Sequence, residues 1–320
     1  MSRPERVLVT GAAGFIGSTL CERLLAEGRS VVGLDNFDPF YPESHKQANL
    51  AAARRSRRFA LVRADLRDAT ALRGVFAGPR IDAIVHLAAL AGVRPSLERP
   101  SEYADVNVRG SSLLFEAAVR AGGPRVVFAS SSSVYGERSD GPFRESDPVD
   151  RPVSPYAATK RAGELIAHSF HHGFGLPVTC ARIFTAYGPR QRPDLAVRKF
   201  AELLLAGKSL PVFGDGSSLR DFTYIDDLVE GLVRALDRDL GFAVLNFAGG
   251  RTVSVLEIVS ALERELGVSA EIDWQPEQTG DVRRTWGDIS AARAALGYEP
   301  KIGFDEGVRR TAAWLREGIK

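Results

Sequence analysis

The feature that most constrains the fold is a glycine-rich segment, Gly11-Ala12-Ala13-Gly14-Phe15-Ile16-Gly17, that directly follows a short apolar run at residues 6–10. Glycines at this spacing let the backbone turn tightly from a strand into a helix and come close to a pyrophosphate. The first turn of such a helix offers free N–H groups and a partial positive charge. The spacing is GxxGxxG rather than GxGxxG, so the segment predicts a dinucleotide site only together with its context.

That context is an alternation of apolar runs and amphipathic segments through the first half of the chain. We expect strands at residues 6–10, 30–34, 59–63, 81–86, 125–129 and 177–184, and helices at 15–27, 69–76 and 102–121. This order predicts an α/β fold of the Rossmann type, a doubly wound parallel sheet with helices on both faces. Its predicted NAD-binding domain spans residues 1–184, with a strand near 243–250 that returns to the same sheet.

The remaining residues, 185–320, are expected to form a smaller α/β domain. Helices are expected at 195–206, 255–266 and 289–296, a strand at 270–274, and loops at 188–194 and 214–220. The chain has no internal repeat and no low-complexity tract.

The ends of the expected strands carry residues that suit a dinucleotide. Asp35 ends the second strand 18 residues after Gly17, where a carboxylate can accept hydrogen bonds from both ribose hydroxyls and repels a 2′-phosphate, so NAD is favoured over NADP. Asp65-Leu66 ends the third strand, beside the expected adenine, and Leu87-Ala88-Ala89 offers small side chains after the fourth. His86, which closes the fourth strand, is expected to be a packed, hydrogen-bonded histidine rather than a catalytic base.

A tyrosine and a lysine, Tyr156 and Lys160, stand four residues apart and therefore share one helical face. An ammonium near a phenol favours the phenolate, which lowers the tyrosine pKa toward neutrality. Such a tyrosine can remove or return the proton of a secondary alcohol during hydride transfer. The serine run 130–133 ends the fifth strand, where doubly wound folds bind ligands. Ser131 and Ser132 are the expected hydroxyls that hold the substrate oxygen.

Composition argues against several other classes of protein. Forty-two basic and 40 acidic residues leave a net charge of +2, so nucleic acid is not an expected partner. Two cysteines, Cys21 and Cys180, cannot form a disulfide framework, and no metal site is expected. No apolar stretch is long enough to span a bilayer, and the first residues lack the core of a signal peptide. We expect a soluble, cytoplasmic protein without a membrane partner.

Five segments together, TGAAGFIG, the Asp35 position, HLAA, SSSSVYG and YAATK, resemble the extended short-chain dehydrogenase/reductase superfamily and its nucleotide-sugar branch. The resemblance extends to FGDGSSLRDFTYIDDLVEG and TGDVRRTWGDISAARAALGYEP. It implies that the N-terminal half binds NAD, that the C-terminal part binds a nucleoside diphosphate sugar, and that the protein is a homodimer through helices at 102–121 and 154–172. The implied cofactor-binding residues are Gly11, Ala13, Gly14, Phe15, Ile16, Gly17, Asp35, Asn36, Asp65, Leu66, Leu87, Ala88, Ala89, Asn107, Tyr156 and Lys160. The implied substrate-binding residues are Arg94, Ser131, Ser132, Ser133, Thr185, Arg192, Lys199, Arg220 and Asp281.

Members of this branch share an oxidation at C4 of the sugar and differ in the later steps. The 4,6-dehydratases carry an Asp-Glu pair in the serine-run segment and the decarboxylases a Glu, whereas this chain has Ser132 and Ser133. The resemblance therefore implies a 4-epimerase.

Three stretches, GLDNFDPFYPESHKQA, HLAALAGVRPS and RIFTAYGPRQRPDLAVRKF, are similar to those of UDP-glucuronate 4-epimerases. In that family the positions of Thr185 and Arg192 contact the sugar carboxylate. The chain departs from the family pattern at Pro95, at Arg190-Gln191 and at Arg198, where phenylalanine is more usual. A 4-epimerase of neutral UDP-sugars and a non-catalytic NAD-binding regulator stay open as alternatives.

Overall fold

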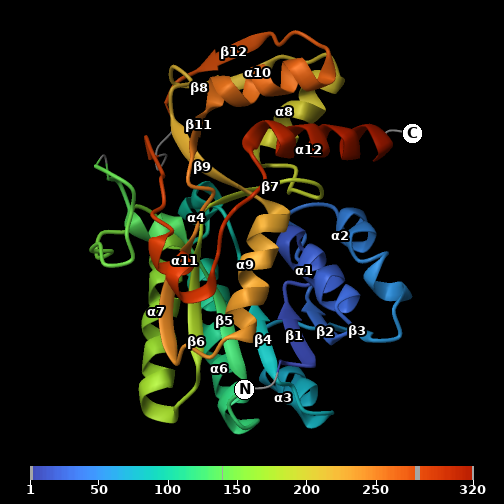
Figure 1. The fold of residues 1–320 in the computed structure, drawn as a ribbon, viewed down its shortest axis with the longest axis vertical. Helices are drawn as coiled ribbons and strands as arrows, with labels where there is room; N and C mark the ends of the chain where they lie inside the picture. The colour runs from blue at the N-terminus through green and yellow to red at the C-terminus, as the bar shows by residue number, and fades with distance from the viewer. Residues whose placement is uncertain (1–2, 139, 278–281, 319–320) are drawn as a thin grey trace.

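A seven-stranded parallel sheet organises the computed structural model, which describes residues 3–138, 140–277 and 282–318 (Figure 1). Its strands lie in the order β10 (Phe242–Phe247), β6 (Val178–Ile183), β5 (Arg125–Ser131), β4 (Ala83–His86), β1 (Arg6–Thr10), β2 (Ser30–Asp35) and β3 (Phe59–Arg63). The strand order reverses between β1 and β4, which is where doubly wound sheets open a crevice for ligands. The expected α/β doubly wound fold is confirmed.

Helices cover both faces of this sheet and make two separate cores. The helices α1 (Phe15–Ala26) and α9 (Ile225–Asp237) pack on one face, and α3 (Ala69–Ala77), α6 (Gly110–Arg120) and α7 (Pro155–Phe174) cover the other. Side chains of a strand alternate between faces, so Val7 and Val9 of β1 join the first core and Leu8 the second. Burial on both faces explains why these strands read as continuous apolar runs.

Smaller elements cap the carboxyl end of the large sheet (Figure 1). A three-stranded sheet has the order β11 (Thr252–Ser254), β9 (Leu219–Tyr224) and β7 (Thr185–Tyr187), and a two-stranded sheet pairs β12 (Ile272–Gln275) with β8 (Leu210–Phe213). The helices α8 (Ala196–Leu205), α10 (Val255–Leu266) and α12 (Phe304–Gly318) pack beside them. The boundary at 184/185 stays a prediction; β6 ends at Ile183, and β10 pairs with β6 in the large sheet.

Short elements complete the described chain. They are α2 (Glu43–Asn49), η1 (Ala53–Arg55), α4 (Val93–Glu98), α5 (Pro100–Tyr103), the π-helical segment η2 (Ala104–Arg109), η3 (Ser132–Tyr135) and α11 (Ser290–Leu296).

Two expectations about local structure were right only in part. The helix expected at 102–121 is present as the continuous succession of α5, η2 and α6, but residues 104–109 are π-helical, and Asn107 within them bonds to the backbone of Leu90. The loop expected at 214–220 ends earlier, because Leu219 and Arg220 already pair with β11.

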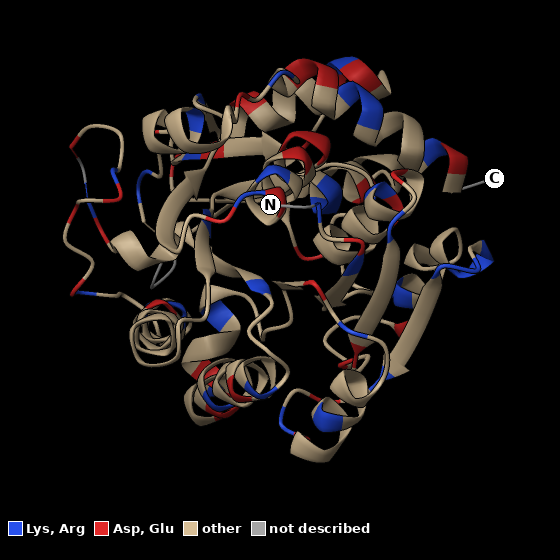
Figure 2. Ribbon diagram, turned by 60° about the horizontal axis from the view of Figure 1, so that its bottom comes forward, with Lys and Arg blue, Asp and Glu red and all other residues tan. Residues whose placement is uncertain are grey.

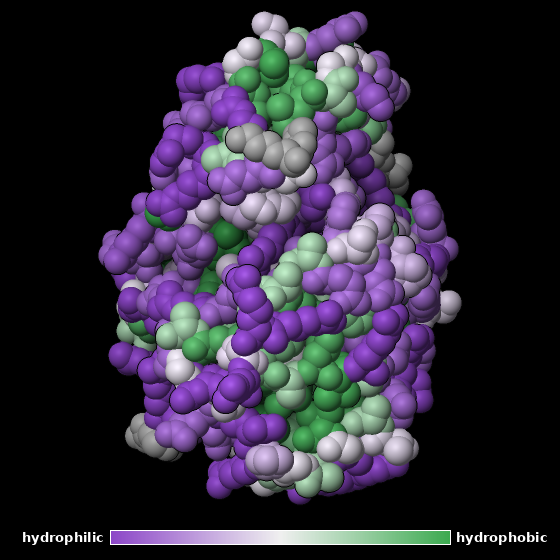
Figure 3. Space-filling view, turned by 90° about the vertical axis from the view of Figure 1, so that its right-hand side faces the viewer, coloured by the Kyte–Doolittle hydropathy of each residue, from purple (hydrophilic) through white to green (hydrophobic). Residues whose placement is uncertain are grey.

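In the view of Figure 2, segments with Lys and Arg are interspersed with segments with Asp and Glu along the ribbon. On the side that carries α1, α2 and α12, hydrophilic side chains surround separate hydrophobic patches (Figure 3). Within residues 3–138, 140–277 and 282–318, no helix combines the length and the hydrophobicity needed to cross a membrane.

Candidate active site

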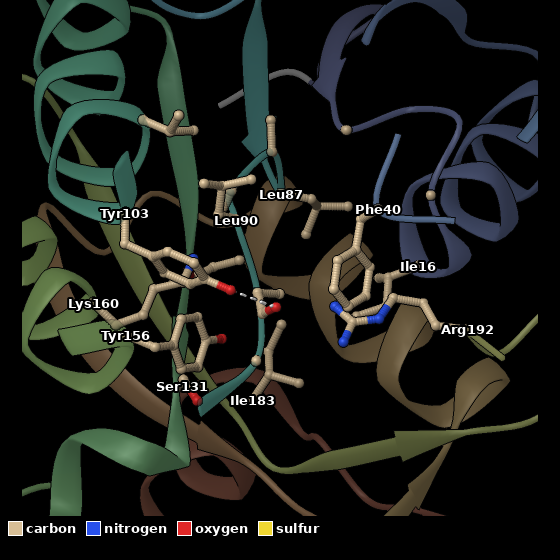
Figure 4. Close-up of a pocket in the computed structure, with 18 of the residues that line it drawn as sticks. Ile16, Phe40, Leu87, Leu90, Tyr103, Ser131, Tyr156, Lys160, Ile183 and Arg192 are labelled. Atoms are coloured by element: carbon tan, nitrogen blue, oxygen red, sulfur yellow. Dashed lines mark hydrogen bonds between the residues drawn. The ribbon is translucent and has the colours of Figure 1, made fainter. Parts of the chain in front are cut away.

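One cavity of about 510 Å³ opens at the carboxyl end of the large sheet. Its wall combines the glycine-rich turn, the ends of β2, β4 and β5, the start of α7, and residues of the smaller sheets. Figure 4 shows Tyr156, Lys160 and Ser131 together on one side of this cavity and Arg192 with Phe40 on the other. The carboxyl ends of the strands thus bring together most of the residues expected from the sequence.

The glycine-rich turn has the shape that a pyrophosphate requires. Gly11 has a φ of +70°, and a Cβ on Gly17 would lie 2.0 Å from the Gly11 carbonyl oxygen, so neither position accepts a side chain. Gly14 caps α1 without a side-chain hydrogen bond, which leaves the first N–H groups of the helix facing the cavity. This cradle fits the diphosphate of NAD.

Asp35 lies at the end of β2, where the sequence predicts the adenosine ribose. Its Oδ2 accepts a hydrogen bond from Ala13 N at 2.9 Å, and its Oδ1 accepts one from Phe37 N at 2.8 Å. These two bonds fix the carboxylate at the end of β2, where it lines the cavity. Asp65 accepts hydrogen bonds from Asn36 Nδ2 and from the Arg67 guanidinium, which holds its pKa well below the usual range. The chemistry of this donor and acceptor set fits an adenosine ribose.

The remaining expected cofactor residues that line the cavity are Phe15, Ile16, Leu66, Leu87, Ala88 and Ala89. Ala13 is not among the described residues that line the cavity, and neither is Asn107. Its Oδ1 accepts from Leu90 N at 2.8 Å, and its Nδ2 donates to Leu90 O and to Thr159 Oγ1, each at 3.0 Å. Asn107 therefore joins the cavity wall to α7 from behind.

Two further side chains at the cavity were missed by sequence reasoning. Lys46 is buried, donates to Asp38 O at 2.8 Å and lies 4.9 Å from the centre of the Tyr41 ring. Tyr103 packs edge-to-face on Tyr156 at 6.3 Å between ring centres. Lys46 lies within GLDNFDPFYPESHKQA. The resemblance of this stretch to a known family was the only sequence feature that could have pointed to Lys46 as a cavity residue.

The tyrosine and lysine of the expected catalytic pair come from adjacent turns of α7. Ser154 caps this helix by accepting from Ala157 N, and Pro155 occupies its first position. Lys160 Nζ donates to Ala129 O at 2.7 Å and lies 5.9 Å from the centre of the Tyr156 ring. Burial lowers the pKa of Lys160 to about 8.

The expectation that Lys160 lowers the tyrosine pKa was wrong for the protein alone. Burial raises the pKa of Tyr156, and a hydrogen bond with Ser131 and the charge of Arg192 act in the opposite direction. The lysine points its ammonium at a backbone carbonyl, so burial dominates over its attraction for the phenolate.

His86 is a packed histidine, as expected. Its Nδ1 lies 2.7 Å from Thr10 Oγ1 and its Nε2 lies 2.9 Å from Ser111 Oγ. Ser111 Oγ donates to Asn107 O, so it accepts from His86, and the proton belongs on Nε2. Burial lowers the pKa of His86 to about 3, which keeps the ring neutral.

A buried ion pair stands behind the serine run. Glu164 on α7 accepts from Arg182 Nε at 2.8 Å and from Arg182 Nη2 at 2.9 Å, and its Oε1 also accepts from Ser130 Oγ at 2.6 Å. The pair therefore connects α7, β6 and the end of β5. Ser131, Ser132 and Ser133 line the cavity in front of it.

The expected substrate residues divide into two groups. Thr185, Arg192 and Arg220 line the cavity. Arg94 and Lys199 are not among the described residues that line it, and the guanidinium of Arg94 instead lies 4.9 Å from the centre of the Phe213 ring.

Asp281 lies outside the described residues. Arg192 is mostly buried, and Asp194 accepts from its Nε at 3.0 Å and from its Nη2 at 2.7 Å.

Comparison with known proteins places the whole chain in one family. The family model of GDP-mannose 4,6-dehydratase matches residues 8–311. A UDP-glucuronate 4-epimerase of Thermodesulfobacterium geofontis is 41% identical over 314 residues, which cover 98% of this chain and 97% of that protein.

Two solved structures resemble the fold over nearly its full length. The UDP-glucuronic acid 4-epimerase of Bacillus cereus, in complex with UDP-glucuronic acid and NAD, has a TM-score of 0.92 and 38% identity over 98% of this chain and 99% of that one. A UDP-glucose 4-epimerase of Thermotoga maritima with UDP-glucose has a TM-score of 0.91 and 32% identity over 98% and 100% of the two chains. The chain therefore belongs to the NAD-dependent epimerase/dehydratase family of extended short-chain dehydrogenases/reductases.

Proposed function

We propose that this protein is an NAD-dependent 4-epimerase that interconverts UDP-glucuronate and UDP-galacturonate through a transient 4-keto sugar. The observation that carries the proposal is the composition of one cavity: a dinucleotide cradle, the Tyr156 and Ser131 hydroxyls and the Arg192 guanidinium all line it. Full-length relatives with this activity, at 41% and 38% identity, support the same conclusion.

The proton chemistry belongs to Tyr156. Its phenolate would take the proton of the 4-hydroxyl and later return it to the 4-keto oxygen, while Ser131 holds that oxygen in place. Lys160 carries the positive charge that compensates the phenolate, and its hydrogen bond to Ala129 O keeps it beside the ring. NAD, when bound, supplies the hydride acceptor and donor at C4. Rotation of the keto sugar between the two hydride transfers inverts the configuration.

Other reactions of the family need a carboxylate beside C5 or C6, and the serine run does not supply one. The carboxylates among the described residues that line the cavity are Asp35, Asp38, Asp65 and Glu102. Asp35 and Asp65 belong to the adenosine end of the site. Hydroxyls at Ser132 and Ser133 cannot drive loss of water across C5 and C6, which favours epimerisation over dehydration.

A sugar carboxylate explains why an arginine stands opposite the tyrosine. A guanidinium donates parallel hydrogen bonds to a carboxylate, and Thr185 can add a hydroxyl on the same wall. The 4-keto intermediate of a uronate is a β-keto acid, which loses CO₂ when its carboxylate stands perpendicular to the ring carbonyl. Holding that carboxylate with Arg192 and Thr185 would bind the substrate and also protect the intermediate. On the nucleotide side, we assign the diphosphate to Arg220.

We further propose a homodimer that packs through α7 and its neighbours. Leu165 and Phe174 of α7 are 55% and 65% exposed, and Leu97 of the adjacent α4 is 44% exposed. Leu165 and Phe174 are nine residues apart and so lie on opposite sides of α7, and the proposal rests on Leu165, because an exposed large apolar side chain suits an interface. Light scattering of Leu165→Arg tests this proposal: we expect a monomer, and an unchanged mass would contradict it.

We also propose the cytoplasm as the compartment of this protein. Cys21 and Cys180 are both buried free thiols, which suits a reducing compartment.

Retention of hydrogen at C4 tests the proposed route. We would run the reaction with UDP-glucuronate in D₂O and examine the product by proton NMR. Because the hydride shuttles within the closed site, UDP-galacturonate should carry hydrogen at C4. Deuterium at C4 would show that the inversion proceeds by proton exchange with solvent and would contradict the mechanism.

A further inference from the structure

The loop at residues 188–195, between β7 and α8, carries Arg192 to the cavity and is held by buried polar contacts. We propose that Gln191 and Arg198 are positioning residues that hold Arg192 at the cavity wall, and that they thereby set the preference for a carboxylate at C6 of the sugar. This inference rests on the proposed function. It concerns residues that do not themselves touch the substrate.

Gln191 joins the two ends of the loop through its side chain, which is fully buried. Its Nε2 donates to Ala186 O at 3.0 Å, and its Oε1 accepts from Arg198 N at 3.0 Å. Ala186 follows Thr185 in β7, and Arg198 lies in the first turn of α8. One amide therefore ties the strand that carries Thr185 to the helix that follows Arg192.

Arg198 fixes the peptide bond that leads into Arg192. Its Nη1 donates to the Gln191 carbonyl oxygen at 2.7 Å, and this oxygen belongs to the peptide that links Gln191 to Arg192. The guanidinium is itself immobilised, because its Nε bonds to Glu202 Oε1 at 2.6 Å and its centre lies 5.5 Å from the Trp314 ring on α12. The side chain of Arg198 is 10% exposed, so water competes little for these donors.

The other side of Arg192 is tied to the dinucleotide half of the molecule. Arg190 adopts a φ of +67°, and its Nη2 lies 2.9 Å from Glu22 Oε1 on α1. The backbone at residue 192 is thus held between α1, which borders the dinucleotide cradle, and α8. A guanidinium on so constrained a backbone meets a carboxylate with little loss of conformational freedom, which is the condition for selective recognition.

Arg198→Met is the first test, because methionine keeps an unbranched stem against Trp314 and removes every donor of the guanidinium. The KM for UDP-glucuronate should rise about tenfold, the effect of one lost buried hydrogen bond, with kcat within about threefold of wild type. The Kd of UDP, which has no sugar carboxylate, should stay unchanged. Arg198→Lys should recover part of the KM, because its ammonium can still donate to the Gln191 carbonyl. Arg120→Met, at a helical arginine that is 68% exposed, is the matched control and should change neither constant.

A double-mutant cycle separates positioning from a general structural role. With Arg192→Ala in place, Arg198→Met should change the KM by less than about twofold, since the residue through which it acts is gone. The inference is overturned if Arg198→Met leaves the KM unchanged, if it raises the KM equally in the Arg192→Ala background, or if the Kd of UDP rises in parallel. Should Arg198→Met not fold, Gln191→Met removes the same tie and must give the same result. Wild-type protein inactive on UDP-glucuronate but active on UDP-glucose would instead overturn the proposed function, and this inference with it.

Discussion

At the residue scale, the proposed proton transfer depends on a single hydroxyl. Tyr156 is half-buried between Ser131 and the edge of the Tyr103 ring, and the charge of Arg192 favours its phenolate. Tyr41 and Lys46 form a second pair of a phenol and an ammonium at the cavity, but it is Tyr156 that hydrogen-bonds to the serine run, through Ser131. Loss of the hydroxyl should therefore remove proton transfer and leave binding intact.

Tyr156→Phe should lower kcat by about 10²- to 10⁴-fold, the usual contribution of a positioned general acid–base group. The Kd of UDP-glucuronate should change only a few-fold. Tyr103→Phe is the matched control, because its hydroxyl donates to Ala91 O rather than to a reacting atom, and it should keep most of the turnover. Steady-state rates together with calorimetric binding give both numbers. A Tyr156→Phe enzyme that retained more than a tenth of the wild-type kcat would disprove the assigned role.

Residues with a local signal could be predicted from the sequence, and residues that reach the cavity through tertiary contacts could not. The glycine turn, Tyr156 and Lys160 depend on spacing within one helix or one turn, and spacing is visible in the sequence. Lys46 and Tyr103 reach the cavity only because α2 and α5 fold back over it. The pKa of Tyr156 was mispredicted for a related reason: spacing shows that Lys160 is near, but not that burial outweighs it.

At the scale of elements, the helix α7 joins the proposed catalytic residues to the strands of the large sheet. It carries Tyr156 and Lys160 at one end of its buried face, and Glu164 one turn later holds Arg182 on β6 and Ser130 on β5. The exposed fractions of the Glu164 and Arg182 side chains are 1% and 3%. Each of these charges has lost its contact with water and is compensated by the other, so removal of one destabilises the protein.

Glu164→Gln should lower the free energy of unfolding by about 3 kcal/mol, because it leaves the buried Arg182 without its counter-charge. Glu116→Gln serves as the control: its partner Arg120 lies 3.5 Å away on the surface of α6, and such pairs contribute less than about 1 kcal/mol. Urea denaturation of both variants measures the difference. Equal losses in the two variants would show that the buried pair does not anchor α7.

Short apolar strands were predicted best at this scale, and segments shaped by a tertiary contact were predicted worst. The strands expected at 6–10 and 59–63 agree with β1 and β3 to the residue. The helix expected at 102–121 is present, but residues 104–109 form π-helical turns around Asn107, which bonds to the Leu90 backbone. Hydrophobic periodicity does not reveal a tertiary contact of this kind.

At the scale of the whole molecule, Asp221 joins the smaller sheets to the large one. It is fully buried in β9, its Oδ1 accepts from Gly249 N at 2.6 Å just after β10, and its Oδ2 accepts from Gly287 N at 3.1 Å. Burial raises the pKa of this carboxyl to about 7, although the backbone N–H groups act in the opposite direction. The connection between the two parts of the fold therefore titrates near neutral pH.

The pH dependence of stability follows from this shift. A carboxyl whose pKa is higher in the folded than in the unfolded protein contributes stability that is complete below about pH 4 and is lost as the pH rises through 7. Between pH 5 and pH 8 we expect wild type to lose about 2.5 kcal/mol more than Asp221→Asn, which cannot titrate there. Urea midpoints of both proteins at the two pH values measure this difference. Parallel losses in the two proteins would show that Asp221 is already ionised at pH 5.

The most direct test of the account is proton NMR of the purified enzyme with UDP-glucuronate and, in a parallel tube, with UDP-glucose, following the anomeric signals of each sugar. We expect an anomeric signal of UDP-galacturonate to grow in the first tube and the second spectrum to stay unchanged, because the Arg192 guanidinium opposite Tyr156 would bind a sugar carboxylate. Conversion of UDP-glucose with no change in UDP-glucuronate would contradict this expectation, and Arg192 would lose its assigned role.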